Sequence, residues 1–186
     1  KLAFFLPENA DFVGDVTVMD IGLHPDFYHN TDSAFELVTH QKIHDWYLPR
    51  KRFSHKGTYG SAALIAGSYG MMGAAVLGAR ACMRSGAGKL TCYVPRCGYY
   101  IIQTSVPEAM CITDENETHH THLTLKNKYD AYAIGPGLGQ SEETAKVITQ
   151  LLNERPLRLV IDADGLNILA SHQELLGLLT PKTILT

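Results

Sequence analysis

Three glycines at residues 67, 70 and 73 lie between an apolar stretch and an alanine-rich segment, in LIAGSYGMMGAAVLGARA (residues 64–81). Glycines let backbone N–H groups approach an anion closely, and the positive end of the following helix would point to the same place. The spacing is not the dinucleotide fingerprint, because Ser68 stands where a glycine is needed, and not the Walker loop, because Ala74 and Ala75 follow Gly73. The segment indicates either a phosphate-binding turn or a tight strand-to-helix turn without a ligand.

Two further loops have similar chemistry. Residues 133–140 read AIGPGLGQ, where Pro136 stiffens a turn whose glycines can adopt positive φ, and residues 159–167 read LVIDADGLN. Asp162 and Asp164 could hold Mg²⁺ or a substrate hydroxyl, although Asp164 could also be a simple helix N-cap. Loops that follow parallel strands meet at one edge of the sheet, so the three loops together predict a site for a polyphosphate ligand.

The elements that must position these loops alternate along the chain. Strands are predicted at residues 62–67, 89–95, 108–113, 130–135, 158–162 and 180–186, and helices at residues 72–85, 141–154 (with Ser141 as N-cap) and from residue 165. This order is typical of an α/β fold with a mostly parallel sheet and helices on both faces. Residues 2–6 and 16–19 are predicted as strands and residues 31–46 as a helix, and a linker at residues 48–60 contains a basic cluster. We expect a domain boundary near residue 30.

Composition narrows the class of protein. The chain has 186 residues, 45% of them hydrophobic, with a formal net charge of -3, which suits an ordinary globular domain and argues against nucleic-acid binding. It shows neither a signal peptide nor an apolar run long enough for a membrane span. Four cysteines without a C-x-x-C pair indicate a reducing, cytoplasmic location, and we interpret His119, His120 and His122 as part of a surface loop rather than a metal site. The first residue is Lys1, which suggests a segment of a longer protein.

Four motifs in order resemble those of the ADP- or ATP-dependent NAD(P)H-hydrate dehydratases, members of the ribokinase-like superfamily. They are HKGTYGSAALIAGSYGMMGAAVLGARACMRSGAGKLTCYVP, AIGPGLGQ, VIDADGLNIL and TILT. Residues 1–30 resemble the closing segment of the NAD(P)H-hydrate epimerase domain that is often fused upstream, and residues 31–186 resemble the N-terminal part of the dehydratase domain. The resemblance implies a lyase that phosphorylates the C6 hydroxyl of the S-form of hydrated NADH or NADPH and then eliminates phosphate, with Mg²⁺ accompanying ADP or ATP.

The resemblance also implies roles for individual residues. Asp162 would be catalytic. The hydrated dinucleotide would be bound by the GPGLG turn, by Ala74 and by Asn167, and within that turn by Gly135, Gly137 and Gly139. The phosphate-bearing nucleotide would be bound by Lys56 and by the first loop, through Gly67, Ser68, Gly70 and Gly73.

The chain departs from the family pattern at its C-terminus. Members continue into a Pro-His-x-x-Glu segment and a Gly-Thr-Gly-Asp loop that supplies an anion hole and the proton-accepting aspartate. We therefore expect the fold to be incomplete at the C-terminus, and residues 1–186 alone to be inactive and to form homo-oligomers. Two other hypotheses are a ribokinase-like kinase of a sugar or vitamin alcohol, and a nucleotide-binding module without catalysis.

Overall fold

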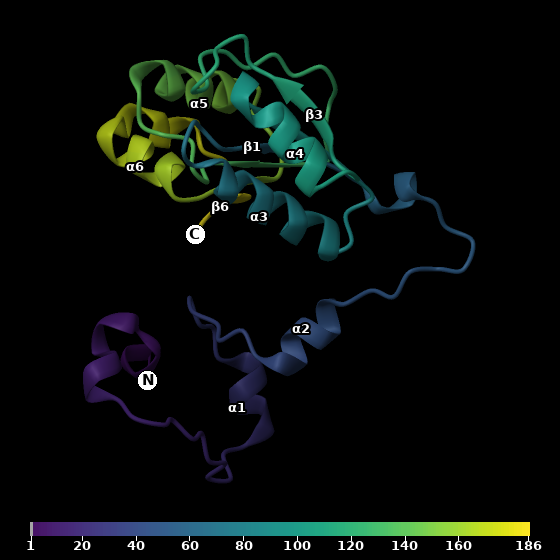
Figure 1. Cartoon of the computed structure of the whole chain (residues 1–186). Coiled ribbons are helices and arrows are strands. Elements are labelled where there is room, and N and C mark those ends of the chain that lie inside the picture. The colour runs from purple at the N-terminus through teal and green to yellow at the C-terminus, as the bar shows by residue number, and fades with distance from the viewer. Residues whose placement is uncertain (1) are drawn as a thin grey trace. The chain divides into compact units, whose positions relative to one another are not determined.

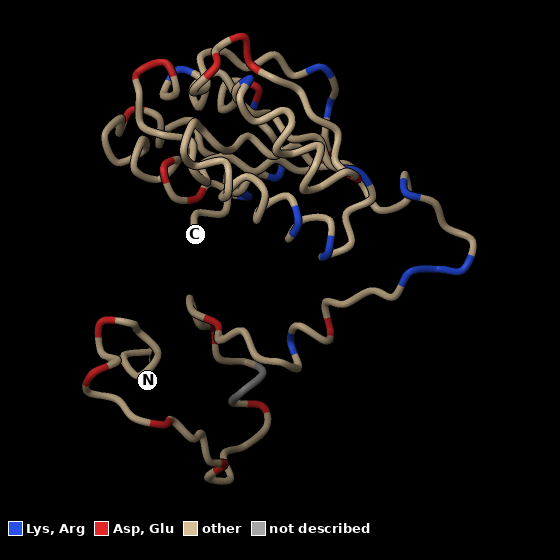
Figure 2. Tube along the Cα trace, viewed as in Figure 1, with Lys and Arg blue, Asp and Glu red and all other residues tan. Residues whose placement is uncertain are grey.

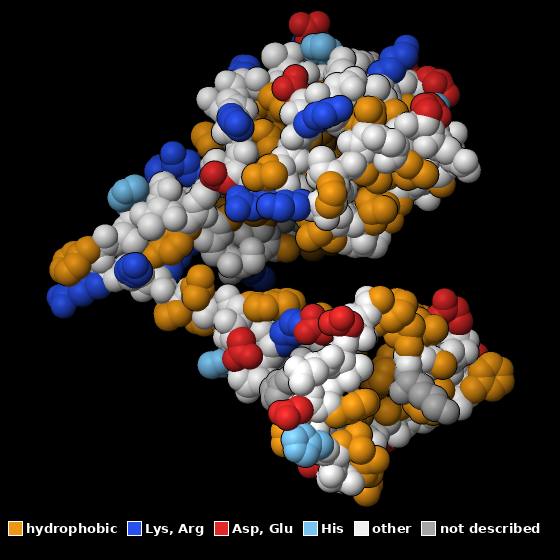
Figure 3. Space-filling view, turned by 180° about the vertical axis from the view of Figure 1, so that it is seen from behind, with side chains coloured by type: hydrophobic (Ala, Val, Ile, Leu, Met, Phe, Trp, Pro, Cys, Tyr) orange, Lys and Arg blue, Asp and Glu red, His pale blue; other side chains and the backbone are white. Residues whose placement is uncertain are grey.

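The computed structural model describes residues 2–186, without the side chains of Tyr28 and His29, and divides the chain into two units, Lys1–Lys51 and Arg52–Thr186 (Figure 1). The first unit contains two 3₁₀ helices, η1 (Leu2–Phe5) and η2 (Pro7–Phe12), and two short α-helices, α1 (Pro25–Asn30) and α2 (His40–Trp46). Of its residues whose burial is described, none is buried, and apolar side chains lie on its surface (Figure 3). The residues of this unit whose burial is described therefore form no hydrophobic core.

Several sequence predictions for the first unit are wrong. Of residues 2–6, predicted as a strand, the first four form η1 instead, and residues 16–19 are neither helix nor strand. The reason is that an isolated apolar stretch becomes a strand only when a neighbouring strand completes its hydrogen bonds, and no strand is described in this unit. The helix predicted over residues 31–46 begins only at His40, because the Thr39 hydroxyl caps it by accepting the Lys42 N–H at 3.3 Å.

The linker predicted over residues 48–60 is only partly irregular, because Lys56–Tyr59 form a 3₁₀ helix. Residues 47–55 contain no helix or strand and include the basic cluster of Arg50, Lys51 and Arg52, and Figure 2 shows blue Lys and Arg positions along the segment between the two units. The division between the units falls inside this cluster. The domain boundary that the sequence predicts near residue 30 stays a prediction, because the division of the structure into two units falls about twenty residues further along the chain.

The second unit is built on a six-stranded sheet in which every pair of neighbours is parallel. The strand order is β3-β2-β1-β4-β5-β6, with bounds Ser61–Ile65 (β1), Lys89–Val94 (β2), Met110–Thr113 (β3), Ala131–Ile134 (β4), Leu159–Ile161 (β5) and Thr183–Leu185 (β6). All six strands predicted between residues 62 and 186 are present, so the predicted α/β class is confirmed.

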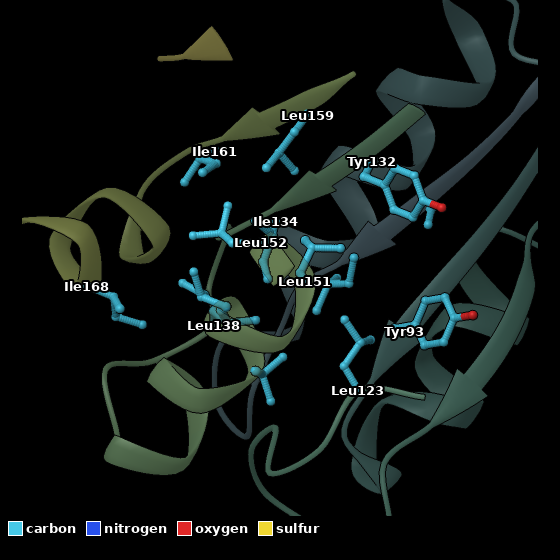
Figure 4. Close-up of a cluster of buried hydrophobic side chains, with 14 of the residues drawn as sticks. Tyr93, Leu123, Tyr132, Ile134, Leu138, Leu151, Leu152, Leu159, Ile161 and Ile168 are labelled. Carbon is cyan, nitrogen blue, oxygen red and sulfur yellow. The ribbon is translucent and has the colours of Figure 1, made fainter. Parts of the chain in front are cut away.

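Helices cover both faces of the sheet, and the helices on each face bury one of the two hydrophobic clusters. Helices α3 (Met72–Arg84) and α4 (Tyr99–Ser105) bury Ala75, Ala79 and Ile102 against one face. On the other face, α5 (Glu142–Asn153) and α6 (Asp164–Ser171) pack against Ile134 and Leu159, as Figure 4 shows. Burying an aliphatic side chain of this kind contributes roughly 1.5–3 kcal/mol, so the two clusters fix the sheet that carries the loops.

Local signals set the helix ends. Ser141 caps α5 as predicted, because its hydroxyl accepts the Thr144 N–H at 3.2 Å, and Glu142 and Glu143 lie in the first turn at the positive end. Gly86, at φ +106°, follows the last turn of α3, as the sequence SGAG predicts. None of the described helices is long and apolar enough to cross a membrane.

The histidine-rich segment between β3 and β4 is only partly a surface loop. Asp114 holds it together: its carboxylate accepts the backbone N–H groups of Asn116, Thr121 and His122 at 2.7–2.9 Å. Partial burial acts to raise the pKa of Asp114, but these hydrogen bonds outweigh it and lower the pKa below its usual value. His120, contrary to the prediction, is buried at 2% exposure, with Nε2 3.3 Å from the Ala66 carbonyl oxygen.

The buried His120 gives the unit a pH-dependent stability. Burial lowers its pKa below the ordinary value, against the smaller opposing effects of the Ala66 carbonyl and the nearby Asp114 carboxylate, while His119 lowers it further. The unfolded chain, with a histidine pKa of about 6.5, therefore binds the proton more readily, so stability is lost as the pH falls below about 6.5. Denaturant unfolding at pH 7, 6 and 5 should show a loss of up to about 1.4 kcal/mol per pH unit from this residue.

Matched variants assign that loss to His120. His120→Gln should flatten the pH dependence of unfolding between pH 6.5 and 5, whereas His122→Gln, at an exposed position, should leave it unchanged. Equal slopes for His120→Gln and the parent would contradict the assignment.

Candidate functional site

The three loops of interest start from one line across the sheet. Ile65 at the end of β1 is in register with Ile134 of β4, which is in register with Ile161 of β5. All three side chains are at most 1% exposed. The loops that follow, residues 66–71, 135–141 and 162–163, therefore leave the sheet side by side, as the sequence predicts.

The first two loops are joined directly. The Gly67 N–H donates to the Pro136 carbonyl at 2.9 Å, and the Ser68 hydroxyl donates to the Gly137 carbonyl at 2.8 Å. A Cβ atom at Gly137 would lie 2.7 Å from the Met71 carbonyl oxygen and 3.0 Å from the Ala74 Cβ. Ala74, in the first turn of α3, is thus a direct neighbour of Gly137.

Three backbone N–H groups in these two loops have no acceptor in the described part of the chain. They belong to Ser68, Gly70 and Gly137. No side chain caps the start of α3, and a Cβ atom added at Gly70 or Gly73 would meet nothing within 4 Å. Free amides, open space and a helix N-terminus together form an arrangement that suits the phosphate groups of a nucleotide.

The second and third loops are also in contact. A Cβ atom at Gly135, where φ is +129°, would lie 1.8 Å from the Asp162 carbonyl oxygen, so only glycine fits. Asp164 accepts the Gly139 N–H at 2.9 Å, the Gln140 Nε2 at 3.0 Å and the Asn167 Nδ2 at 3.3 Å. The structure thus brings the two loops into one cluster, and Asn167 reaches that cluster through Asp164.

One of the two carboxylate oxygens of Asp162 accepts a hydrogen bond. Its Oδ1 accepts the N–H of the next residue, Ala163, at 2.7 Å, while its other carboxylate oxygen accepts from no described residue. The side chain is half-buried at the end of β5. A carboxylate held by its own turn and still accessible could bind Mg²⁺ or accept a proton.

Asp164 differs from the prediction that it caps α6. Ala163 is the N-cap residue, with φ 48° and ψ -120°, and Asp164 is the first residue of the helix. A positive φ is rare for alanine, and such strain is concentrated at functional sites. The sequence gives no sign of this conformation, because DADG also reads as an ordinary cap. Asp164, expected from the sequence to hold Mg²⁺ or a hydroxyl or to cap the helix, accepts hydrogen bonds from the second loop, and no sequence signal pointed to Ala163 or Gln140.

Lys56 does not lie with the other predicted site residues. It begins the 3₁₀ helix η3 (Lys56–Tyr59), just before β1, and therefore lies at the amino edge of the sheet. The five residues of β1, about 16 Å of strand, separate that edge from the loops. Lys56 instead lines a cavity of about 470 Å³ with residues that include Gly88 and Lys89. The expectation that it helps to form the loop site is therefore not supported by the geometry.

Among residues 2–186, no group of three His, Cys, Asp or Glu side chains is arranged to hold a metal ion. The site consists of backbone donors, two aspartates and small side chains at the carboxyl edge of a parallel sheet. In open α/β sheets this edge is where nucleotides and related phosphates bind. The fold is thus an open parallel α/β domain whose three loops gather at the edge where ligands of such sheets bind.

Comparison with known proteins specifies the family. The sequence pattern of the NAD(P)H-hydrate dehydratase family matches residues 62–186, so the chain belongs to that family. It is 35% identical over 139 residues to the ADP-dependent (S)-NAD(P)H-hydrate dehydratase of Listeria monocytogenes, covering 73% of this chain and 49% of the relative. It is 32% identical over 185 residues to the bifunctional NAD(P)H-hydrate repair enzyme Nnr of Moorella thermoacetica, covering 95% of this chain and 35% of that enzyme.

Solved structures agree. The ADP/ATP-dependent NAD(P)H-hydrate dehydratase from Bacillus subtilis, co-crystallised with ATP and Mg²⁺, superposes with a TM-score of 0.59 at 34% identity, covering 68% of this chain and 45% of that protein. A ribokinase-like superfamily protein from Enterococcus faecalis shares the fold at 22% identity, with a TM-score of 0.60, covering 74% of this chain and 48% of that protein. The chain therefore spans less than half of the length of each of these four relatives.

The close contact at Gly135 can be tested by substitution. Gly135→Ala should lower the free energy of unfolding by roughly 2–4 kcal/mol, because the new Cβ atom forces the second and third loops apart and the positive φ is strained for alanine. Gly73→Ala is the matched control in open space, and it should be neutral or stabilise by up to about 1 kcal/mol, since alanine favours a helix. Denaturant unfolding measures both, and equal effects would contradict the geometry.

Proposed function

We propose that the protein containing this chain repairs damaged nicotinamide cofactors, by ADP- or ATP-dependent dehydration of the S-form of hydrated NADH and NADPH. The family membership of residues 62–186, together with the three joined loops at the carboxyl edge, carries the proposal. The names of the Listeria and Moorella relatives favour this reaction over the kinase of a sugar or vitamin alcohol.

The reaction needs two steps. The C6 hydroxyl of the hydrated ring takes a phosphoryl group from ADP or ATP, and phosphate then leaves C6 as a ring proton is lost, which restores the dihydropyridine. Phosphoryl transfer depends mainly on positioning and charge stabilisation. In our proposal the free amides of Ser68, Gly70 and Gly137 bind phosphate groups, and Gly73 and Ala74 lie beside them. Asp162 acts in the transfer, and Mg²⁺, when bound with the nucleotide, neutralises phosphate charge.

We also propose that the first 30 residues are the end of an epimerase domain. Two observations support this. The match to the bifunctional Moorella enzyme covers 95% of the chain and so includes most of the first unit. That unit buries no residue whose burial is described, which is expected of a piece of another domain rather than a folding unit.

Asp162 provides the direct test of function. In the full-length protein, Asp162→Asn should lower the turnover of hydrated NADH at least tenfold, about 1.4 kcal/mol in barrier, with little change in melting temperature. Asparagine keeps the shape and can still accept the Ala163 N–H, so stability is retained. Recovery of NADH absorbance with ADP or ATP and Mg²⁺ measures the turnover.

Asp114→Asn is the contrasting variant, because Asp114 holds a loop through backbone hydrogen bonds. It should lower the melting temperature while turnover at low temperature persists. Normal turnover with a lowered melting temperature in Asp162→Asn would assign that residue to structure. A parent protein without activity on hydrated NADH, and with release of a stable phosphorylated alcohol instead, would favour a kinase.

Residues 1–186 alone should be catalytically silent, marginally stable and inclined to self-associate. β6 is an outer strand of the described sheet, and Ile184 and Leu185 are 57% and 49% exposed on it. An unpaired apolar edge promotes association. Incubation of the purified segment with hydrated NADH, Mg²⁺ and either nucleotide should give only background conversion, and light scattering should show oligomers. Conversion above background would contradict this prediction.

A further inference from the structure

The second glycine loop is built on three glycines with positive φ, Gly135, Gly137 and Gly139. It is fastened on two sides. On the side of the first loop, the Ser68 hydroxyl and the Gly67 N–H hold the carbonyls of residues 137 and 136. On the side of the third loop, one side chain, Asp164, makes the hydrogen bonds.

Asp164 suits this task chemically. An ionised carboxylate only accepts hydrogen bonds, and here its two oxygens receive three donors: Oδ2 takes the Gly139 N–H, while Oδ1 takes the amide nitrogens of Gln140 and Asn167. The first turn of α6 also favours a negative charge at this position. The loop N–H that it holds lies two residues beyond Gly137, whose own N–H is free for a ligand.

The backbone before Asp164 is held in a strained conformation. Ala163 has φ 48° and ψ -120°, a conformation that a non-glycine residue keeps only when its surroundings impose it. The Leu166 and Asn167 N–H groups both donate to the Ala163 carbonyl, at 2.9 and 3.1 Å, and the Gly165 N–H donates to the Asp162 carbonyl at 2.9 Å. This turn places the Asp164 carboxylate on the second loop while Asp162 stays accessible.

We propose that Asp164 is a positioning residue that clamps the second glycine loop in its ligand-binding geometry without itself touching the ligand. The kinetic part of the test rests on the proposed function, with hydrated NADH as the ligand. Because the loop contacts substrate and transition state alike, loss of the clamp should weaken binding more than it slows the chemical step.

The experiment uses the full-length protein and two variants of this residue. In Asp164→Ala, hydrogen-exchange mass spectrometry should show at least tenfold faster exchange in the peptide containing Gly139. The KM for hydrated NADH should rise at least fivefold, with kcat within about twofold of the parent. Asp164→Asn retains an oxygen that can accept the Gly139 N–H, so it should recover most of both properties.

Asp130→Ala is the matched control, since Asp130 also holds backbone and hydroxyl donors, those of Ser61, but at the amino edge of the sheet. It should change neither the exchange at Gly139 nor the KM. Unchanged exchange in Asp164→Ala overturns the clamp, and so does faster exchange with an unchanged KM. If the parent protein does not convert hydrated NADH, the proposed function fails, and the exchange at Gly139 alone then decides whether the clamp exists.

Discussion

The parallel register of Ile65, Ile134 and Ile161 is the constraint on which the candidate site depends. Each residue is the last of its strand, and each is buried between the helices of the two faces. A slip of one residue in any of these strands would turn its side chains to the opposite face. The core therefore fixes, to within one residue, where the three loops begin, and it brings residues that are far apart in sequence close enough for the loops to form hydrogen bonds with one another.

Beyond that line, the loops are held mainly by their own backbone and by two short polar side chains. Gly135 fits against the Asp162 carbonyl because it lacks a Cβ atom, and Ser68 and Asp164 each fasten one side of the GPGLG turn. Such an arrangement sets the amide groups before a ligand arrives, which lowers the cost of binding and of charge stabilisation. The strain at Ala163 is consistent with a site whose geometry is imposed by its surroundings.

The sequence predicts the second unit well because its signals are both local and mutually consistent. Apolar stretches such as AALIA and RLVI alternate with helical periodicity, and Ser141 marks a helix start, so strands, helices and the shared loop edge follow. Prediction from the sequence fails where contacts between distant residues determine the local conformation or the burial of a side chain. The stretch LAFFL has strand composition but no partner strand, His120 is polar yet buried against Ala66, and the conformation of Ala163 cannot be inferred from its type. Lys56 is close to the first loop in sequence, but a strand separates the two.

The charge of the loops limits what they can do unaided. Residues 67–73, 135–140 and 162–167 contain two aspartates and no lysine or arginine. In our proposal a dinucleotide and a second nucleotide would both bring negative phosphates to this edge, where backbone amides supply only partial positive charge. The aspartates would repel those phosphates unless a cation lies between them. The carboxylate oxygen of Asp162 that accepts no hydrogen bond from a described residue could bind such a cation. A divalent ion shared by Asp162 and the nucleotide would turn that repulsion into attraction. Binding of nucleotide at this site should therefore be much weaker without Mg²⁺ than with it.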